Sequence, residues 1–292
     1  MNLFWQILID GFIISSIYAV GVVGFSLVFG TAGVLNLSHG ALLVVSAIFF
    51  WFFVSNFHIP LVLGMAGGII ISVIVSYLLF IIVINPIDKS KKIPQDEKEV
   101  FVLTATLLWS MIIEEILIYF FSSNPVVAPP FVKGVLKIFN MNITCNEILL
   151  SLSSIVILIL LWLFINKTRT GKILLAASMS HDGLAISGID LKKVYITLWG
   201  VYGILTGVSG ALLASFLGAS PSSAGPLTGL AFSVVVLGGL GNITGSIIAA
   251  FLIGYIQTMT AYLISPAYTP IPAYVILILI LMFKPKGLFG RF

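Results

Sequence analysis

The chain has 292 residues, of which 60% are hydrophobic and only 8% are charged, whereas soluble domains carry roughly 25% charged residues. A soluble protein of this length keeps a large solvated surface, for which this chain has too few polar groups. The composition excludes a soluble enzyme, a disordered protein and a nucleic-acid-binding protein. It predicts an all-α, polytopic transmembrane bundle.

Nine apolar segments are candidates for membrane spans, because a spanning helix needs about 20 mostly apolar residues. The seventh and ninth are short and are expected to be broken or re-entrant. We therefore predict one transmembrane domain over residues 1–292 with about eight or nine spans. In chain order the segments are 3–29, 41–57, 60–84, 100–121, 148–165, 194–219, 227–240, 246–264 and 271–283.

Basic residues indicate the orientation of these spans. All but two of the 14 Lys and Arg residues lie in 85–99, in 166–193 and in the tail from residue 284. Because Lys and Arg collect in cytoplasmic loops, these segments and the C-terminus are predicted to be cytoplasmic. The exceptions, Lys133 and Lys137, lie in a loop that one span separates from each neighbouring cytoplasmic segment, so this loop is predicted to lie outside. Three spans precede residues 85–99, so the same count of spans would place the N-terminus outside.

The first motif interrupts the apolar sequence between the first two segments and contains Gly30, Gly33, Asn36, His39 and Gly40. Glycine permits a break in a helix, and unwound backbone at membrane depth occurs only inside protein or beside a cavity. We predict a broken helix beside a translocation pathway, with the Asn and His side chains holding its freed amides and carbonyls. A tight turn at the membrane edge is the alternative. No metal site is expected, because no second His or carboxylate is near.

Two carboxylates, Glu114 and Glu115, lie within the fourth segment. Intramembrane carboxylates usually face a bundle interior or an aqueous cavity, so they are candidate polar contacts along the pathway or a proton relay. The alternative is that both are hydrated near the outer surface. Adjacent helical residues point about 100° apart, so at most one is expected to face a given cavity.

The cytoplasmic loop 166–193 is the least apolar of the long connections. It contains a predicted short helix at 173–179, followed by turn signals at Asp182-Gly183 and Gly188. Because its apolar content is high for a solvated loop, we predict that it docks into a groove on a soluble partner.

The start of this loop nearly matches a phosphate-binding motif but fails at both ends. Asn166 stands where the motif has Gly, and Ile173 stands where it has Ser or Thr. We therefore predict that this chain does not itself bind ATP and carries no cofactor.

The sixth segment carries Gly200, Gly203, Gly207 and Gly210 at spacings of three and four, which places them on one helix face. Such a stripe lets another helix approach closely, so we interpret it as a packing face.

A second glycine-rich break contains Gly238, Gly239, Gly241, Asn242 and Gly245. It is similar to the first motif, and paired breaks in two halves of a transporter indicate an internal repeat with a central site. Coincidence in a glycine-rich membrane chain is the alternative.

Together these motifs resemble the permease family of branched-chain amino acid ABC importers, over nearly the whole chain. The family pattern Gly-x-x-Gly-x-x-Asn-x-x-His-Gly matches the first motif, and Gly-Gly-x-Gly-x-x-x-Gly matches the second. The family's C-terminal pattern matches Pro285, Gly287, Leu288, Gly290 and Arg291.

The long loop resembles the family's ATPase-coupling loop. One departure is that Leu174 and Leu175 occupy a region where the family often has Arg, and a second is that only Asp182 remains of an acidic pair. The coupling residues implied by the resemblance are Arg169, Gly171, Ala176, Ala177, Ser178, Asp182 and Gly188.

The resemblance implies a permease subunit, of the shorter of the two types, in an ATP-driven importer for branched-chain or other hydrophobic amino acids. It implies a non-enzymatic chain in a prokaryotic plasma membrane. The implied partners are cytoplasmic ATPase subunits, a second permease chain and an extracellular substrate-binding protein. Related permeases for amides, urea or sugars keep the substrate open. The competing hypothesis is a stand-alone secondary transporter or channel that couples protons through Glu114 or Glu115.

Overall fold

The computed structural model describes residues 2–94, 97–138, 141–179, 183–184, 187–284 and 286–290. Within these residues nine helices are long and apolar enough to cross a membrane, so the predicted polytopic helical bundle is confirmed. The helices are α1 (Asn2–Ala32), α2 (His39–Asn56), α3 (Leu61–Leu79), α5 (Lys98–Phe121), α6 (Cys145–Lys167), α9 (Leu191–Phe216), α10 (Ala224–Gly238), α11 (Ile243–Leu263) and α12 (Ile271–Phe283).

Shorter elements extend or connect these helices. The 3₁₀ turns η3 (Pro221–Ser223) and η4 (Pro266–Tyr268) precede α10 and α12, so each of the two short predicted spans becomes an 18-residue segment. The π-helical turn η1 (Phe80–Ile84) and α4 (Asn85–Lys89) continue α3. The remaining elements are α7 (Arg169–Ala177) and a two-stranded antiparallel ribbon, β1 (Val135–Ile138) and β2 (Met141–Thr144).

Two helix starts differ from the prediction because of capping. α6 begins at Cys145 rather than 148, because the Thr144 hydroxyl accepts the Glu147 N–H and the Glu147 carboxylate accepts the Thr144 N–H. α7 begins at Arg169 rather than 173, because the Thr168 hydroxyl accepts the Gly171 N–H.

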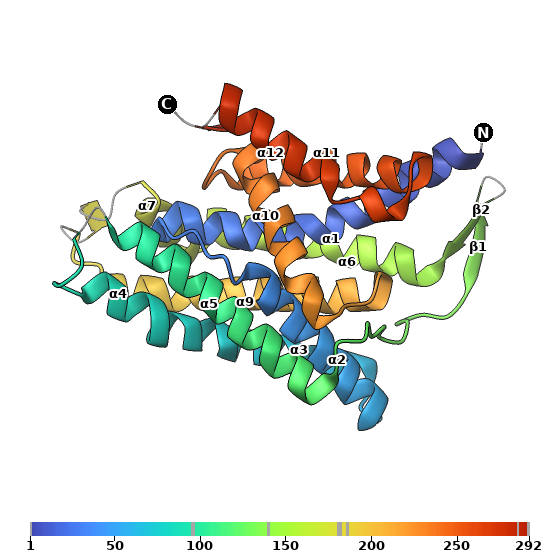
Figure 1. Cartoon of the computed structure of the whole chain (residues 1–292), viewed down its shortest axis with the longest axis horizontal. Helices are drawn as coiled ribbons and strands as arrows, with labels where there is room; N and C mark the ends of the chain where they lie inside the picture. The colour runs from blue at the N-terminus through green and yellow to red at the C-terminus, as the bar shows by residue number, and fades with distance from the viewer. Residues whose placement is uncertain are drawn as a thin grey trace.

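The bundle is built from two inverted halves around α1 and α9. These two helices are the most buried spans: 78% of an 18-residue apolar stretch of α1 and 72% of one of α9 are buried, compared with 6% for the span that contains α12. α1 packs against α11 as α9 packs against α3, and α2 packs against α10. The series α1–α2–α3–α5 therefore repeats, with opposite direction, as α9–α10–α11–α12, and α6 packs on α1 outside the repeat (Figure 1).

This repeat differs from the one suggested by the glycine motifs. Both central helices are followed by a short irregular segment, 33–38 after α1 and 217–223 after α9, and these two breaks are counterparts. The glycine-rich corner at 239–242 joins α10 to α11 and corresponds instead to the turn 57–60 between α2 and α3.

The glycine stripe of α9 lies against neighbouring helices. Gly200, Gly203 and Gly207 face α3, and Gly210 faces the backbone of α2. A Cβ on Gly203 would lie 2.7 Å from the Val73 Cα, which is closer than real Cβ contacts. The absence of side chains therefore permits this close approach, as is common between membrane helices.

The cations gather at one end of the bundle. Figure 1 shows α4, α7 and the C-terminus toward one end, and the N-terminus and the β1–β2 ribbon at the other. Of the basic residues that the structure describes, only Lys133 and Lys137 lie at the ribbon end. The other end, called the basic end below, carries Lys89, Lys91, Lys92, Lys98, Lys167, Arg169, Lys172, Lys192, Lys193, Lys284 and Lys286.

Candidate functional site

The first break is a buried segment that leads from the end of α1 back into the bundle (Figure 1). α1 ends because Gly33 adopts a φ of +67°, which glycine tolerates. Asn36 then organises the non-helical segment: its Oδ1 accepts the Ser38 N–H at 3.0 Å and the Ser38 hydroxyl at 2.7 Å. Asn36 and Ser38 are fully buried, so these two side chains lie inside the bundle.

Tyr202 of α9 joins the two polar residues of this break. The Asn36 Nδ2 donates to the Tyr202 hydroxyl at 2.9 Å, and the His39 Nδ1 lies 3.0 Å from the same oxygen. Either atom can donate in the His39–Tyr202 contact, depending on which ring nitrogen of His39 carries a proton. His39 thus bonds α9 rather than the freed backbone that the sequence prediction assigned to it.

Aromatic rings enclose the His39–Tyr202 contact. The Phe25 ring lies 5.2 Å from the His39 ring, centroid to centroid, and the Trp199 ring lies edge-on to Tyr202 at 5.4 Å. The His39 Nε2 has no hydrogen-bond partner among the described residues. Sequence reasoning missed Tyr202, because a lone tyrosine in the middle of an apolar span carries no motif.

The start of α2 also connects this break to two other helices. The Leu37 N–H donates to the Thr106 hydroxyl of α5 at 3.1 Å, and the Gly40 N–H donates to the Thr228 hydroxyl of α10 at 2.8 Å. A Cβ on Gly40 would collide with the Ala224 carbonyl oxygen. The N-terminal ends of α2 and α10 therefore meet backbone to backbone.

The second break, 217–223, lies closer to the surface than the first. Gly218 has a φ of +80°, and Ala219 and Val126 exchange two 2.8 Å backbone hydrogen bonds. Ser222, Gly225 and Pro226 are exposed. Irregular backbone and small polar groups are therefore uncovered at the start of α10.

The glycine-rich corner between α10 and α11 lies at the basic end and touches the end of α1. A Cβ on Gly30 would lie 3.0 Å from the Gly241 Cα, and Gly238 and Gly245 face each other across the corner. The Asn242 Oδ1 accepts the Gly245 N–H at 3.0 Å and so caps α11. The two glycine motifs of the sequence therefore meet in space, although they are not repeat counterparts.

The corner also holds the C-terminal tail. The Asn242 Nδ2 donates to the Phe289 carbonyl at 2.8 Å, and the Leu288 N–H donates to the Leu237 carbonyl at 2.8 Å. Gly239, with a φ of +95°, lies against the backbone of Gly290. Pro285 and Arg291, which complete the family's C-terminal pattern, lie outside the described residues.

The predicted coupling residues occupy α7 and the segment after it. Leu174 and Ala177 are buried against the bundle, and Gly171 packs on the backbone at the end of α6. Arg169, Lys172, Leu175 and Ser178 are exposed, and Ala176 is half-buried. Asp182 lies outside the described residues. Gly188 has a φ of +74° and open space around it.

The two carboxylates of α5 are not part of the buried network. Glu115 is exposed on the outer surface and Glu114 is half-buried. The buried row of α5 consists of other residues, among them Thr106, Ser110 and Ile113.

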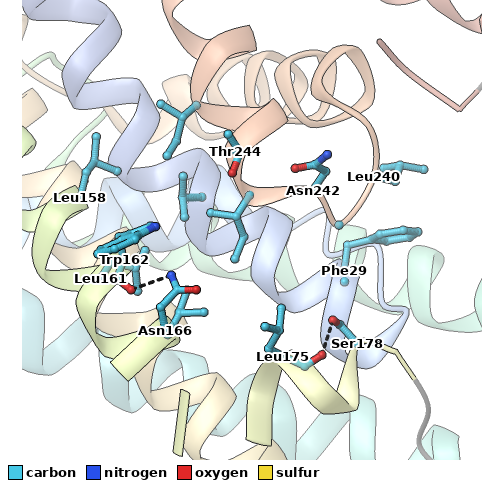
Figure 2. A pocket seen from close by; sticks show the side chains of 16 residues that line it. Phe29, Leu158, Leu161, Trp162, Asn166, Leu175, Ser178, Leu240, Asn242 and Thr244 are labelled. Carbon is cyan, nitrogen blue, oxygen red and sulfur yellow. Dashed lines mark hydrogen bonds between the residues drawn. The ribbon is translucent and has the colours of Figure 1, made fainter. Parts of the chain in front are cut away.

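An open groove of about 560 Å³ lies at the basic end. Figure 2 shows Leu158, Leu161, Trp162 and Asn166 of α6 on one side, and Asn242 and Thr244 of the α10–α11 corner on the other. α1 and α7 contribute further lining residues. Its lining side chains are uncharged.

Comparisons with known proteins agree with this architecture. A family model described as the permease component of the branched-chain amino acid transport system matches residues 7–283. The chain is 22% identical to the high-affinity branched-chain amino acid transport system permease protein LivH of Escherichia coli, over 99% of this chain and 96% of that protein. It is 24% identical to the corresponding permease BraD of Pseudomonas aeruginosa, over 98% of this chain and 95% of that protein.

A more distant relative is the fructose import permease protein FrcC of Rhizobium meliloti, which is 23% identical over 83% of this chain and 68% of that protein. No solved structure matches the chain. The family match spans nearly all of the helical bundle, so the resemblance predicted from the motifs is confirmed: the chain belongs to the family of permease components of the branched-chain amino acid transport system.

Proposed function

We propose that this chain is the membrane-spanning permease subunit of an ATP-driven importer of branched-chain or other hydrophobic amino acids. The observation that carries this proposal is the family match over two inverted halves, together with a helix break whose Asn36 and His39 side chains both bond the Tyr202 hydroxyl of α9. ATP hydrolysis belongs to a separate partner chain in this proposal, since the sequence lacks a complete phosphate-binding motif.

The basic end faces the cytoplasm of a prokaryotic cell, because the excess of Lys and Arg marks the cytoplasmic side. α7 and the C-terminal tail are then on the side of the ATPase. The exposed residues Arg169, Lys172 and Leu175 of α7 are available for docking, while Leu174 and Ala177 anchor the helix to the bundle.

The first break acts as the hinge of the pathway. It is held by a few side-chain bonds to Tyr202 and within the segment, each worth about 1 kcal/mol net. A rearrangement of α2 against α9 would exchange these discrete hydrogen bonds. Inverted repeats that rock around a central site are a common basis of alternating access.

A second permease chain covers the second break. α10 has 15 residues and a length of about 22 Å, and it ends at the basic end, so its start lies within a hydrocarbon core of about 30 Å. Lipid cannot satisfy irregular backbone at that depth. Ser222, Gly225 and Pro226 are exposed there, so this surface requires another protein or a water-filled path between two chains.

Transport by reconstituted protein tests the proposal. The chain, its genomic neighbour ATPase and the neighbouring binding protein would be placed in liposomes, and uptake of labelled leucine, isoleucine and valine would be measured. We expect uptake that needs both ATP and the binding protein. Uptake of fructose or ribose but not of these amino acids would identify a sugar as the substrate. A sugar is the second candidate because of the similarity to the fructose import permease.

The stand-alone transporter predicts a different result in the same assay. Uptake by the chain alone, driven by a proton gradient and abolished by Glu114→Gln or Glu115→Gln, would overturn the importer. The exposed position of Glu115 on the outer surface of α5 favours the importer, in which these substitutions leave ATP-driven uptake unchanged.

A further inference from the structure

The groove at the basic end has its floor on α1 and its sides on α6 and α11, which both pack against α1. Leu158, Leu161 and Trp162 point into it from α6 (Figure 2), and Val23 and Ile247 complete its apolar part. Leu158 lies nine residues before the end of α6, about 13 Å along the helix. The groove therefore extends from the membrane surface into the hydrocarbon region.

The polarity of the groove changes along its length. The end of the groove that lies at the basic end of the bundle is called the mouth below. The polar lining residues lie at this mouth and are Asn166, Ser178, Asn242 and Thr244. The Asn166 Nδ2 donates to the Trp162 carbonyl at 2.9 Å, which leaves its second amide proton for a ligand. The Trp162 indole is 57% exposed beside the mouth, as is usual for tryptophan at a membrane surface.

Cations flank this mouth. Lys167 directly follows Asn166, Arg169 begins α7, and Lys172 lies one turn before Leu175, whose side chain lines the groove. The sequence contains no Asp or Glu between Glu147 and Asp182. α11 also begins at the mouth, so the positive end of its dipole adds to the potential there.

We infer that this groove binds an anionic phospholipid, with an acyl chain along the apolar part and the phosphate at the mouth. The uncharged apolar part suits a hydrocarbon chain, and basic pockets between helices at a membrane surface attract anionic headgroups. A soluble ATPase does not reach the part lined by Val23 and Leu158, because that part lies below the headgroups. The inference does not depend on the transported substrate.

Native mass spectrometry of the purified chain with added phosphatidylglycerol or phosphatidylcholine tests this inference. We expect preferential binding of phosphatidylglycerol. Removing the flanking charges in K167Q/R169Q/K172Q should weaken that binding about tenfold, because each cation near a membrane surface attracts anionic lipid. The matched control K89Q/K91Q/K92Q removes three charges from the same end of the bundle, away from the groove, and should leave binding unchanged.

A second pair of variants tests the apolar part of the groove. Ile247→Trp should fill it and reduce phosphatidylglycerol binding, whereas Leu252→Trp, on the exposed surface of the same helix, should not. Equal binding of the two lipids, or equal loss in both triple variants, would overturn the inference. Ile247→Trp that changes the oligomeric state but not lipid binding would also overturn it, by showing that a second chain occupies the groove. Lipid binding by the two tryptophan variants is interpreted only if circular dichroism shows native helicity. If Ile247→Trp misfolds, the comparison of the two triple charge variants decides whether the inference holds.

Discussion

The two breaks occupy equivalent places in the inverted halves but differ in the burial and hydrogen bonding of their polar groups. In 33–38 the Asn36 and Ser38 side chains are buried and bonded, to each other and, through Asn36, to Tyr202. In 217–223 the serines bond mainly one another, and Ser222 is exposed. The comparison teaches that two breaks at equivalent places can differ in how their polar groups are covered, and under the proposed function the first would act as an internal hinge and the second as an interface.

The largest expected effect follows from removing the side chain that organises the first break. Asn36→Leu keeps the volume but deprives the buried Ser38 N–H and hydroxyl of their acceptor. A buried polar group without a partner costs about 1–3 kcal/mol, so we expect a loss of about 3 kcal/mol in stability. Thermal unfolding in detergent measures it. Asn56→Leu, at an exposed asparagine, is the control, and an equal loss there would contradict the hinge.

The next effect tests the contact between the start of α2 and the start of α10. Gly40→Ala places a Cβ against the Ala224 carbonyl, and overpacking of this kind costs about 1–3 kcal/mol. We expect lower thermal stability and loss of uptake in liposomes. Gly225→Ala, on the other side of the same helix start and with open space around it, should be neutral. If both variants behave alike, the two breaks are not coupled.

A smaller effect isolates the hydroxyl that joins Asn36 to His39. Tyr202→Phe removes it without a cavity, and we expect a loss of about 1–2 kcal/mol. In a double-mutant cycle with Asn36→Leu the losses should be less than additive, because both variants remove the same hydrogen bond. Tyr119→Phe, at a surface tyrosine, is the control. Additive losses would show that the hydroxyl acts independently of the break.

The smallest effect on stability comes from the second break. Ser222→Cys, in a Cys145→Ser background, should change stability by less than about 0.5 kcal/mol. It should nevertheless react with water-soluble thiol reagents or form crosslinks between permease chains in membranes. Ser38→Cys, in the buried break, should do neither. An unreactive Ser222→Cys that also forms no crosslink would show that lipid covers this surface.

The helical spans could be predicted from sequence because length and apolar content decide them within a bilayer. The ends were less predictable where one side chain sets the first turn, as Thr144 does for α6 and Thr168 for α7. The two short segments reach the length of a span because the turns η3 and η4 extend them. Both turns begin with proline, and η3 also contains two serines, residues that hydropathy alone assigns to loops.

The candidate site was only partly predictable. Asn36, His39 and Gly40 stand out as polar or glycine residues in an apolar sequence, and they do lie together. Their partners Tyr202 and Thr228, and Thr106, which accepts the neighbouring Leu37 N–H, come from three other helices and have no local signature. The pairing of the breaks was also invisible, because the second break is marked by serines and a proline rather than by the Gly-Asn pattern of the first.

The sequence by itself determined that this protein is a helical membrane bundle with its cations gathered at one end. The hydrocarbon core accepts only long apolar helices and few charges, and the Lys and Arg residues lie almost entirely in three segments between or after the spans. The tertiary structure decided which polar residues meet, that the halves are inverted, and that Asn36 and Ser38 of the first break are buried whereas Ser222 of the second is exposed. Those properties depend on contacts between helices far apart in the chain, such as Gly40 with Thr228, and local sequence does not encode them.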